Sequence, residues 1–154
     1  MKRINELSRR ARLGNAPVIF VQHEAISGDY FMHGSEAWAL DASLTIGSTD
    51  HFVRKTTPDS FLRTNLESVL LENSISHLVI CGYATEFCID TTVRRAASLG
   101  YDVAIVSDAH TTHDKAHDEA AHIIAHHNAT LPNIKSFGVH ILAQKSKAVE
   151  FAHV

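Results

Sequence analysis

One cysteine in this sequence lies where a nucleophilic sulfur would be well placed. The apolar run at residues 78–81 predicts a buried strand, and a polar turn at 82–86 leads into a helical pattern with Cys88 near its start. Unpaired backbone N–H groups and the positive end of the helix dipole favour a thiolate over a thiol at such a position. A thiolate there could attack a carbonyl carbon and form a covalent intermediate.

Such chemistry also needs a group that handles the proton and donors that stabilise the oxyanion. Lys55 follows a short strand predicted at 51–54, and its ammonium would favour the thiolate of Cys88 by charge. A lysine by itself is usually a solvated surface residue, and a cysteine is more often a small buried hydrophobe than a nucleophile. Cys81, inside the apolar strand, is predicted to be inert core.

The elements that must position these residues alternate along the chain. Strands are predicted at 17–22, 51–54, 78–81, 103–106 and within 135–142. Helices are predicted before Gly14, from a cap at Asp59 or Ser60 to Leu70, from the turn at 82–86 to Gly100, and at 114–128. This order predicts a three-layer α/β/α Rossmann-like sandwich with a mostly parallel five-stranded sheet. Ligands bind beyond the carboxyl ends of strands in such sheets, so Lys55, the turn before Cys88 and Asp108 could share one site.

Two loops could contribute to that site. Residues 24–48 show few periodic positions, and a loop of that length is usually functional, for example as a lid or pocket wall. Trp38, the only tryptophan, could anchor this loop, contact a substrate with its ring, or do both. A polar loop is predicted at 108–113, where Asp108 could line the site or orient the loop by hydrogen bonds, and we favour the second role. The tail at 145–154 is predicted as a weak or frayed helix.

Composition excludes several classes of protein. The chain of 154 residues is expected to form a single domain over 1–154, and its net charge of −3 argues against nucleic acid or a membrane as partner. No apolar run approaches the roughly 20 residues that span a bilayer, and the first residues lack a signal-peptide core. The two cysteines do not suggest a disulfide framework, so a cytoplasmic location is expected.

The region around Cys88 resembles the isochorismatase-like cysteine hydrolases, a superfamily that includes the nicotinamidases. The likeness rests on Cys-Gly-Tyr-Ala-Thr-Glu-Phe-Cys-Ile at 81–89 and Val-Ser-Asp-Ala at 106–109, and other matches extend over 17–140. The resemblance implies that Cys88 is the nucleophile and Lys55 its catalytic partner. It also implies a cis peptide bond between Tyr83 and Ala84, with the backbone N–H groups of Ala84 and Cys88 forming the oxyanion hole.

The resemblance implies hydrolysis of a C–N bond in a small amide, lactam or imide through a Cys88 thioester, without a cofactor. The family also hydrolyses the vinyl ether of isochorismate, but that reaction does not require the cysteine, so Cys88 favours amides. We expect Trp38, Tyr83 and Phe61 to contact the small-molecule substrate. Family members commonly form dimers or tetramers, so a homodimer or homotetramer is expected.

The sequence departs from the resembled family at its beginning. Family members carry a catalytic Asp at the end of a first strand, and neither that strand nor that Asp is found here. In the family this strand lies between those matching 17–22 and 77–81. These two strands could therefore close up, or they could leave a gap whose unpaired backbone groups invite a partner's strand. We expect weak or absent activity, and the alternative is an inactive family member with a binding or assembly role.

The twelve histidines raise the question of a metal site. Nicotinamidases hold a divalent ion just past the strand that matches 17–22, but Gln22-His23-Glu24-Ala25 does not keep their pattern, so no metal is predicted there. His113 with His117, and His122 with His126, are four residues apart on a predicted helix, a spacing that can bind Zn or Ni. We favour a solvated or interface helix face over a metal site.

Overall fold

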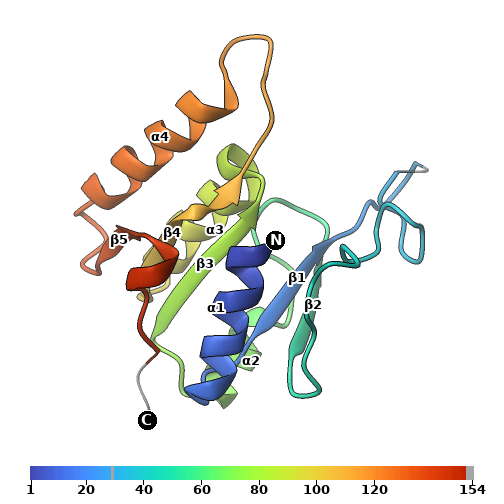
Figure 1. Cartoon of the computed structure of the whole chain (residues 1–154), viewed down its shortest axis with the longest axis horizontal. Coiled ribbons are helices and arrows are strands. Elements are labelled where there is room, and N and C mark those ends of the chain that lie inside the picture. Colours follow the sequence, from blue (N-terminus) through green and yellow to red (C-terminus); the bar gives the residue numbers. More distant parts are fainter. Residues whose placement is uncertain (29, 152–154) are drawn as a thin grey trace.

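The computed structural model describes residues 1–28 and 30–151. Its elements are α1 (Lys2–Leu13), β1 (Ile19–His23), β2 (His51–Lys55), α2 (Leu66–Glu72), β3 (His77–Tyr83), the π-helix η1 (Thr85–Ile89), α3 (Asp90–Ser98), β4 (Asp102–Thr111), α4 (Ala120–Thr130), the 3-10 helix η2 (Leu131–Asn133), β5 (Ile141–Gln144) and the 3-10 helix η3 (Ser146–Ala148). Figure 1 shows helices on both sides of the strands, so the predicted α/β/α layering and element order are confirmed.

The five strands run parallel but form two separate sheets. β1 pairs with β2 from Ile19 opposite His51 to His23 opposite Lys55, and β4 lies between β3 and β5 in the second sheet. The five parallel strands that the sequence predicts are present, divided into a two-stranded and a three-stranded sheet. β1 and β3 do not pair with each other, so of the two alternatives for these strands the structure adopts the gap (Figure 1).

Apolar side chains cover the strands on both faces. On one face, Leu7 of α1 packs with Val106 of β4 and Val149, and Val79 and Cys81 of β3 lie against this group. The main core lies on the other face, where α2 and α3 contribute Leu66, Leu70, Val93, Ala96 and Ala97. Helix α1 has apolar residues at helical spacing, as predicted, and it lies across the region between β1 and β3 (Figure 1).

Two helices begin later than predicted. α2 starts at Leu66 with Asn65 as its N-cap, because the Asp59 carboxylate accepts the N–H of Phe61 and so stabilises a turn instead of a helix. α4 starts at Ala120 and not at residue 114, because the Asp114 carboxylate accepts the N–H of Ala120 across the intervening turn. The actual helices are therefore shorter than the periodicity indicated.

Strand β4 is longer than predicted, and most of the expected polar loop at 108–113 belongs to it. A register shift after Ile80 brings Gly82 opposite His110 and Tyr83 opposite Thr111. This second stretch of pairing extends β4 to Thr111. Residues 24–28 and 30–48 contain no helix or strand, in agreement with the predicted loop, and residue 29 lies outside the described part.

The end of the chain forms only one short helix in its described part, η3, and residues 152–154 of the predicted frayed helix lie outside it. Within the described residues, every helix falls short of the length and apolarity that crossing a membrane requires.

Candidate active site

Cys88 lies in the turn of π-helix that joins β3 to α3. Gly82, at a φ of 128° that favours glycine, lets the chain leave β3, and the Tyr83–Ala84 peptide bond is cis, as the resemblance implied. The carbonyl of Ala84 then accepts the N–H groups of Phe87 and Ile89 at 3.2 and 3.1 Å, which closes the turn around Cys88. Ala84 is buried and Cys88 half-buried, so this tight turn presents the sulfur with partial access to solvent.

Cys88 and Lys55 line the same cavity. It has a volume of about 1400 Å³ and extends from the carboxyl ends of the strands down the space between β1 and β3. Tyr83 and Phe61 also line it, as does Asp108 of β4. The structure therefore brings together most of the predicted site residues, which are separated in the sequence by a strand, two helices and several turns.

Lys55 is the last residue of β2, and its side chain is buried, with 4% of the residue exposed. Its Nζ donates hydrogen bonds to the carbonyl oxygens of Thr57 and Pro58 at 2.9 and 3.0 Å. In the part of the chain that the structure describes, no carboxylate forms an ion pair with this ammonium. Burial, followed in size by the charge of Lys55, holds the pKa of neighbouring His23 below its usual range.

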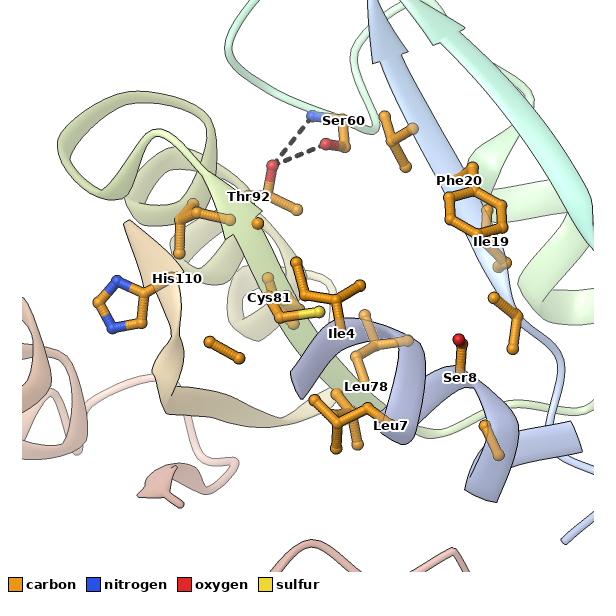
Figure 2. Close-up of a pocket in the computed structure, with 18 of the residues that line it drawn as sticks. Ile4, Leu7, Ser8, Ile19, Phe20, Ser60, Leu78, Cys81, Thr92 and His110 are labelled. Atoms are coloured by element: carbon orange, nitrogen blue, oxygen red, sulfur yellow. Dashed lines mark hydrogen bonds between the residues drawn. The ribbon is translucent and has the colours of Figure 1, made fainter. Parts of the chain in front are cut away.

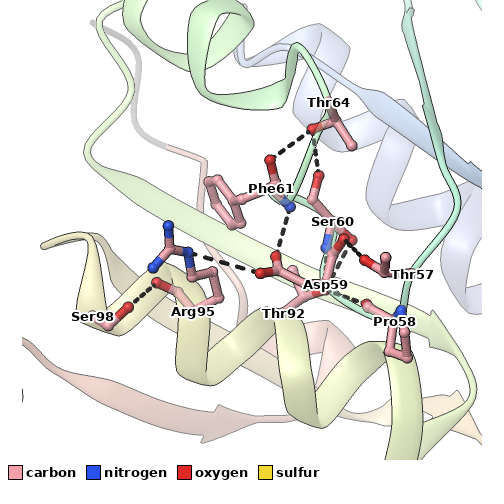
Figure 3. Close-up of polar contacts among 9 residues, drawn as sticks. All are labelled: Thr57, Pro58, Asp59, Ser60, Phe61, Thr64, Thr92, Arg95 and Ser98. Carbon is pink, nitrogen blue, oxygen red and sulfur yellow. Dashed lines mark hydrogen bonds and ion pairs between the residues drawn. The ribbon is translucent and has the colours of Figure 1, made fainter.

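The loop that holds the Lys55 ammonium is fastened to α3, the helix that follows Cys88. The Ser60 and Thr92 hydroxyls share a hydrogen bond of 2.8 Å, the Thr92 oxygen also accepts the N–H of Ser60, and Thr92 lies 3.4 Å from the carbonyl of Pro58 (Figure 3). Asp59 adds an ion pair to Arg95 at 3.8 Å. This network couples the position of Lys55 to that of the Cys88 turn and gives Thr92 a structural role.

His110 supports the Cys88 turn from the other side, and the sequence interpretation did not identify it. Asn128 donates through Nδ2 to the carbonyl of Ser107, so its Oδ1 accepts the Nε2–H of His110 at 3.0 Å. The Nδ1 atom of His110 then accepts the hydroxyl of Thr85, the first residue of η1, at 2.9 Å. Burial holds the pKa of His110 below its usual value and keeps the ring neutral for this arrangement. The only sequence signal for His110 is that it belongs to β4, a strand that the sequence prediction ended too early, at Val106.

Aromatic and charged side chains surround the outer end of the site. Tyr83 is 56% exposed, and its hydroxyl lies 2.9 Å from Nδ1 of His113. The Lys115 ammonium lies 5.4 Å from the ring centre of Phe87 and 2.9 Å from the Glu86 carboxylate. Burial alone would raise the pKa of Glu86, but hydrogen bonds from its own N–H, Lys115 and a threonine hydroxyl hold that pKa below its usual value. Two aromatic rings, those of Tyr83 and Phe87, are therefore exposed near the Cys88 turn.

Three further candidates have other surroundings. Trp38 lines a separate pocket of about 660 Å³ with Gln22, whose side chain donates to the backbone carbonyl of Trp38 at 3.2 Å and so ties the loop to β1 at this residue. Phe61 is buried with its ring centre 5.9 Å from that of Tyr101, although it also lines the large cavity. The Asp108 carboxylate accepts both the N–H and the hydroxyl of Ser146 and therefore orients the C-terminal segment.

Of the two histidine pairs predicted on a helix, one lies on α4 and the other precedes it. His113 and His117 precede α4, because that helix begins only at Ala120, whereas His122 and His126 do lie on it. His122 lies 3.1 Å from the Asp118 carboxylate, and His126 lies 3.3 Å from the hydroxyl of Thr130. Within residues 1–28 and 30–151, no three His, Cys, Asp or Glu side chains are grouped as metal ligands.

Known proteins show the same fold and related sequences. An isochorismatase domain matches residues 1–135. Streptothricin hydrolase of Streptomyces noursei is 33% identical over 114 residues, which cover 74% of this chain and 41% of that protein. Ureidoacrylate amidohydrolase RutB of Variovorax paradoxus (strain S110) is 33% identical over 89 residues, covering 58% of this chain and 34% of that protein. The chain therefore spans less than half the length of these two curated relatives.

Among solved structures, a crystal structure of an isochorismatase family protein superimposes with a TM-score of 0.84 and 36% identity, covering 94% of this chain and 82% of that one. Because the family domain matches most of the chain, the protein belongs to the isochorismatase family.

Proposed function

We propose that this chain hydrolyses a C–N bond in a small amide, lactam or imide through a thioester on Cys88. The observation that carries the proposal is one cavity lined by the half-buried Cys88 and by the buried ammonium of Lys55. The names of the two curated relatives, a hydrolase and an amidohydrolase, support the same class of reaction.

In the proposed reaction, the Cys88 thiolate attacks the carbonyl carbon, and the C=O electron pair moves onto oxygen. The backbone N–H groups of Ala84 and Cys88 stabilise that oxyanion in this proposal, because both residues belong to the turn between β3 and α3. The tetrahedral intermediate collapses, the C–N bond breaks, and the amine leaves with a proton from solvent water, which took up the proton of the Cys88 thiol when the thiolate formed. Water then attacks the thioester, which releases the acid and restores the thiol.

The roles of the remaining residues follow from their positions. The Lys55 ammonium stabilises negative charge on the Cys88 sulfur, and its two carbonyl partners hold it in place. Tyr83 at the rim and Phe61 in the wall provide apolar contact to a substrate. Trp38 acts through its loop, from the neighbouring pocket.

We also propose that turnover by this chain is slow. The ammonium of Lys55 has no carboxylate partner among the described residues, so no acidic side chain there is paired with it to take the thiol proton. The test compares this chain with one that carries an added N-terminal strand ending in Asp, on the same amide substrate. Faster turnover by the extended chain is expected, and equal turnover would refute the slow-turnover proposal.

Because Lys55 has no carboxylate partner among the described residues, a second candidate function is also favoured, a catalytically inactive family member with a binding or assembly role. Alkylation with iodoacetamide at pH 7, followed by peptide mass spectrometry, distinguishes the two functions. An activated Cys88 is labelled faster than free cysteine, and Lys55→Met slows this labelling. Cys81 is the internal control, because burial raises the pKa of its thiol to about 11. Cys88 labelling no faster than free cysteine would overturn the catalytic proposal.

We further propose that the chain is a single domain that works in the cytoplasm as a homodimer or homotetramer. Both cysteines are free thiols, which suits a reducing compartment. Light scattering after size-exclusion chromatography measures the mass directly, and a monomer at micromolar concentration would contradict the oligomer.

A further inference from the structure

A second pocket shares no lining residue with the large cavity among the residues that the structure describes. Figure 2 shows the large cavity, where apolar side chains such as Ile4, Phe20 and Leu78 line the space. The second pocket has a volume of about 660 Å³, within the roughly 300–1,000 Å³ of typical small-molecule sites. Its lining residues come from the end of β1, the long loop, β2 and the turn before α2: Gln22, Glu24, Trp38, Phe52, Arg54, Arg63, Thr64 and Asn65. Apart from Trp38, these residues have no part in the proposed hydrolysis.

The indole of Trp38 brings a hydrogen-bond donor to this pocket. Its Nε1–H is buried and has no acceptor in the described part of the chain, although buried donors of this kind are nearly always paired. The ring of His33 packs against the indole with ring centres 4.5 Å apart, and Gln22 holds the Trp38 backbone carbonyl at 3.2 Å. The donor is therefore held in position, and an oxygen atom of a ligand in the pocket would satisfy it.

The charges of the pocket favour an anion. Two arginines and one glutamate line it, and Arg54 binds Glu24 through two hydrogen bonds of 2.7 and 3.0 Å, so these two charges offset each other. Arg63 is exposed and forms no ion pair with any residue that the structure describes. Its planar guanidinium matches the geometry of a carboxylate. Because the Glu24 charge repels a dianion more strongly than a monoanion, a single carboxylate fits better than a phosphate.

Phe52 gives the pocket an aromatic surface. This residue of β2 is 47% exposed, although its side chain is large and apolar. Its ring stacks on that of Phe20, with ring centres 5.8 Å apart and an angle of 22° between the planes, so the ring is held in place. A fixed and exposed ring offers a stacking surface to a second ring. An aromatic ligand would therefore cover apolar surface that water now contacts.

We propose that this pocket binds a small aromatic monocarboxylate, at a site separate from Cys88. The carboxylate pairs with the guanidinium of Arg63 and accepts the indole N–H of Trp38, and the aromatic ring packs against Phe52. The inference goes beyond the proposed function and does not depend on the reactivity of Cys88. Binding here and labelling of Cys88 are measured separately, so either proposal can fail while the other holds.

The test uses the indole N–H itself, because Trp38 is the only tryptophan and gives a single indole signal in a proton–nitrogen correlation spectrum of the full chain. The probe is phenylpropionate at constant ionic strength. We expect the indole proton to move downfield saturably, since it gains a charged acceptor. Phenylpropanol keeps the ring without the charge, and cyclohexanepropionate keeps the charge without the aromatic ring. Each should bind about tenfold more weakly. No saturable shift with millimolar probe, or an equal affinity for the alcohol, would overturn the proposal.

Matched variants locate the binding site. Arg63→Gln should weaken binding of phenylpropionate about tenfold and leave the affinity for phenylpropanol nearly unchanged. Arg9→Gln is the control, because Arg9 is an exposed arginine of α1 outside the pocket, and it should bind the probe as the unmodified chain does. Tyr83→Ala alters the large cavity and should keep the indole shift.

A thermal melt checks that each variant is folded, and the comparison of acid with alcohol on the unmodified chain needs no variant. Equal weakening by Arg63→Gln and Arg9→Gln would show that the probe responds to overall charge and would overturn the proposal. Loss of the indole shift in Tyr83→Ala would place the probe in the large cavity and would overturn it as well.

Discussion

The contact between Ser60 and Thr92 allows a quantitative test of how the Lys55 loop is held. Thr92→Val keeps the shape of the side chain but removes the oxygen that accepts the Ser60 N–H and shares a hydrogen bond with the Ser60 hydroxyl. Both residues are buried, at 5% and 7% exposure, so water cannot readily replace the lost partner. An unsatisfied buried polar group costs about 1–3 kcal/mol, so we expect the free energy of unfolding to fall by about 2 kcal/mol.

Urea denaturation measures this loss directly. With an m-value of about 2 kcal/mol/M, the expected loss lowers the urea midpoint by about 1 M. A double-mutant cycle with Ser60→Ala is the control, because removing both partners leaves one fewer unsatisfied group. We expect the double variant to be more stable than the sum of the single losses predicts, by about 1 kcal/mol. Thr92→Ser keeps the hydroxyl and should cost only about 0.8 kcal/mol for the lost methyl group.

Catalytic geometry provides a second measurement on the same variants. Since Thr92 also contacts the carbonyl of Pro58, which holds the Lys55 ammonium, Thr92→Val should slow iodoacetamide labelling of Cys88 more than Thr92→Ser does. If Thr92→Val changes stability by less than about 0.5 kcal/mol and leaves labelling unchanged, the network does not couple the two sites. The reasoning from these contacts would then be wrong.

Two further predictions concern pH. Burial depresses the folded-state pKa of His110, so the stability that its neutral ring provides is present above about pH 6.5 and is lost as pH falls. The urea midpoints at pH 7.5 and 5.5 should therefore differ less in His110→Gln than in the unmodified chain. An equal fall of the midpoint between these pH values in both proteins would contradict this prediction. Arg12 donates hydrogen bonds of 2.8 and 2.6 Å to the Asp50 carboxylate, whose side chain is 1% exposed. Arg12→Met leaves this buried carboxylate without its partner, and we expect the free energy of unfolding to fall by about 3 kcal/mol near neutral pH. Because Arg12 holds the pKa of Asp50 below its usual value, this difference between the two proteins should shrink below about pH 4, and a constant difference down to pH 3 would refute the assignment.

Local sequence determined the arrangement around Cys88. An apolar run followed by Gly82 specifies strand β3 and its exit, and both features depend on neighbouring residues in the chain, whereas the expected burial is only partial. The same holds for α1, where Ile4, Leu7 and Ala11 recur at helical spacing, and for Lys55 at the end of a short strand. The strand–helix–strand order then fixes a parallel pairing of β3 and β4, so the α/β/α fold could be predicted without coordinates.

Tertiary structure decided the features that depend on partners distant in the sequence. β4 continues to Thr111 only because a register shift lets it pair again with β3, and this extension places His110 beneath the Cys88 turn. The hydrogen bonds of Asp59 and Asp114 decide where α2 and α4 begin. The separation of β1 from β3 is likewise a property of the assembled sheets, because an apolar strand sequence does not specify which edges will find a partner.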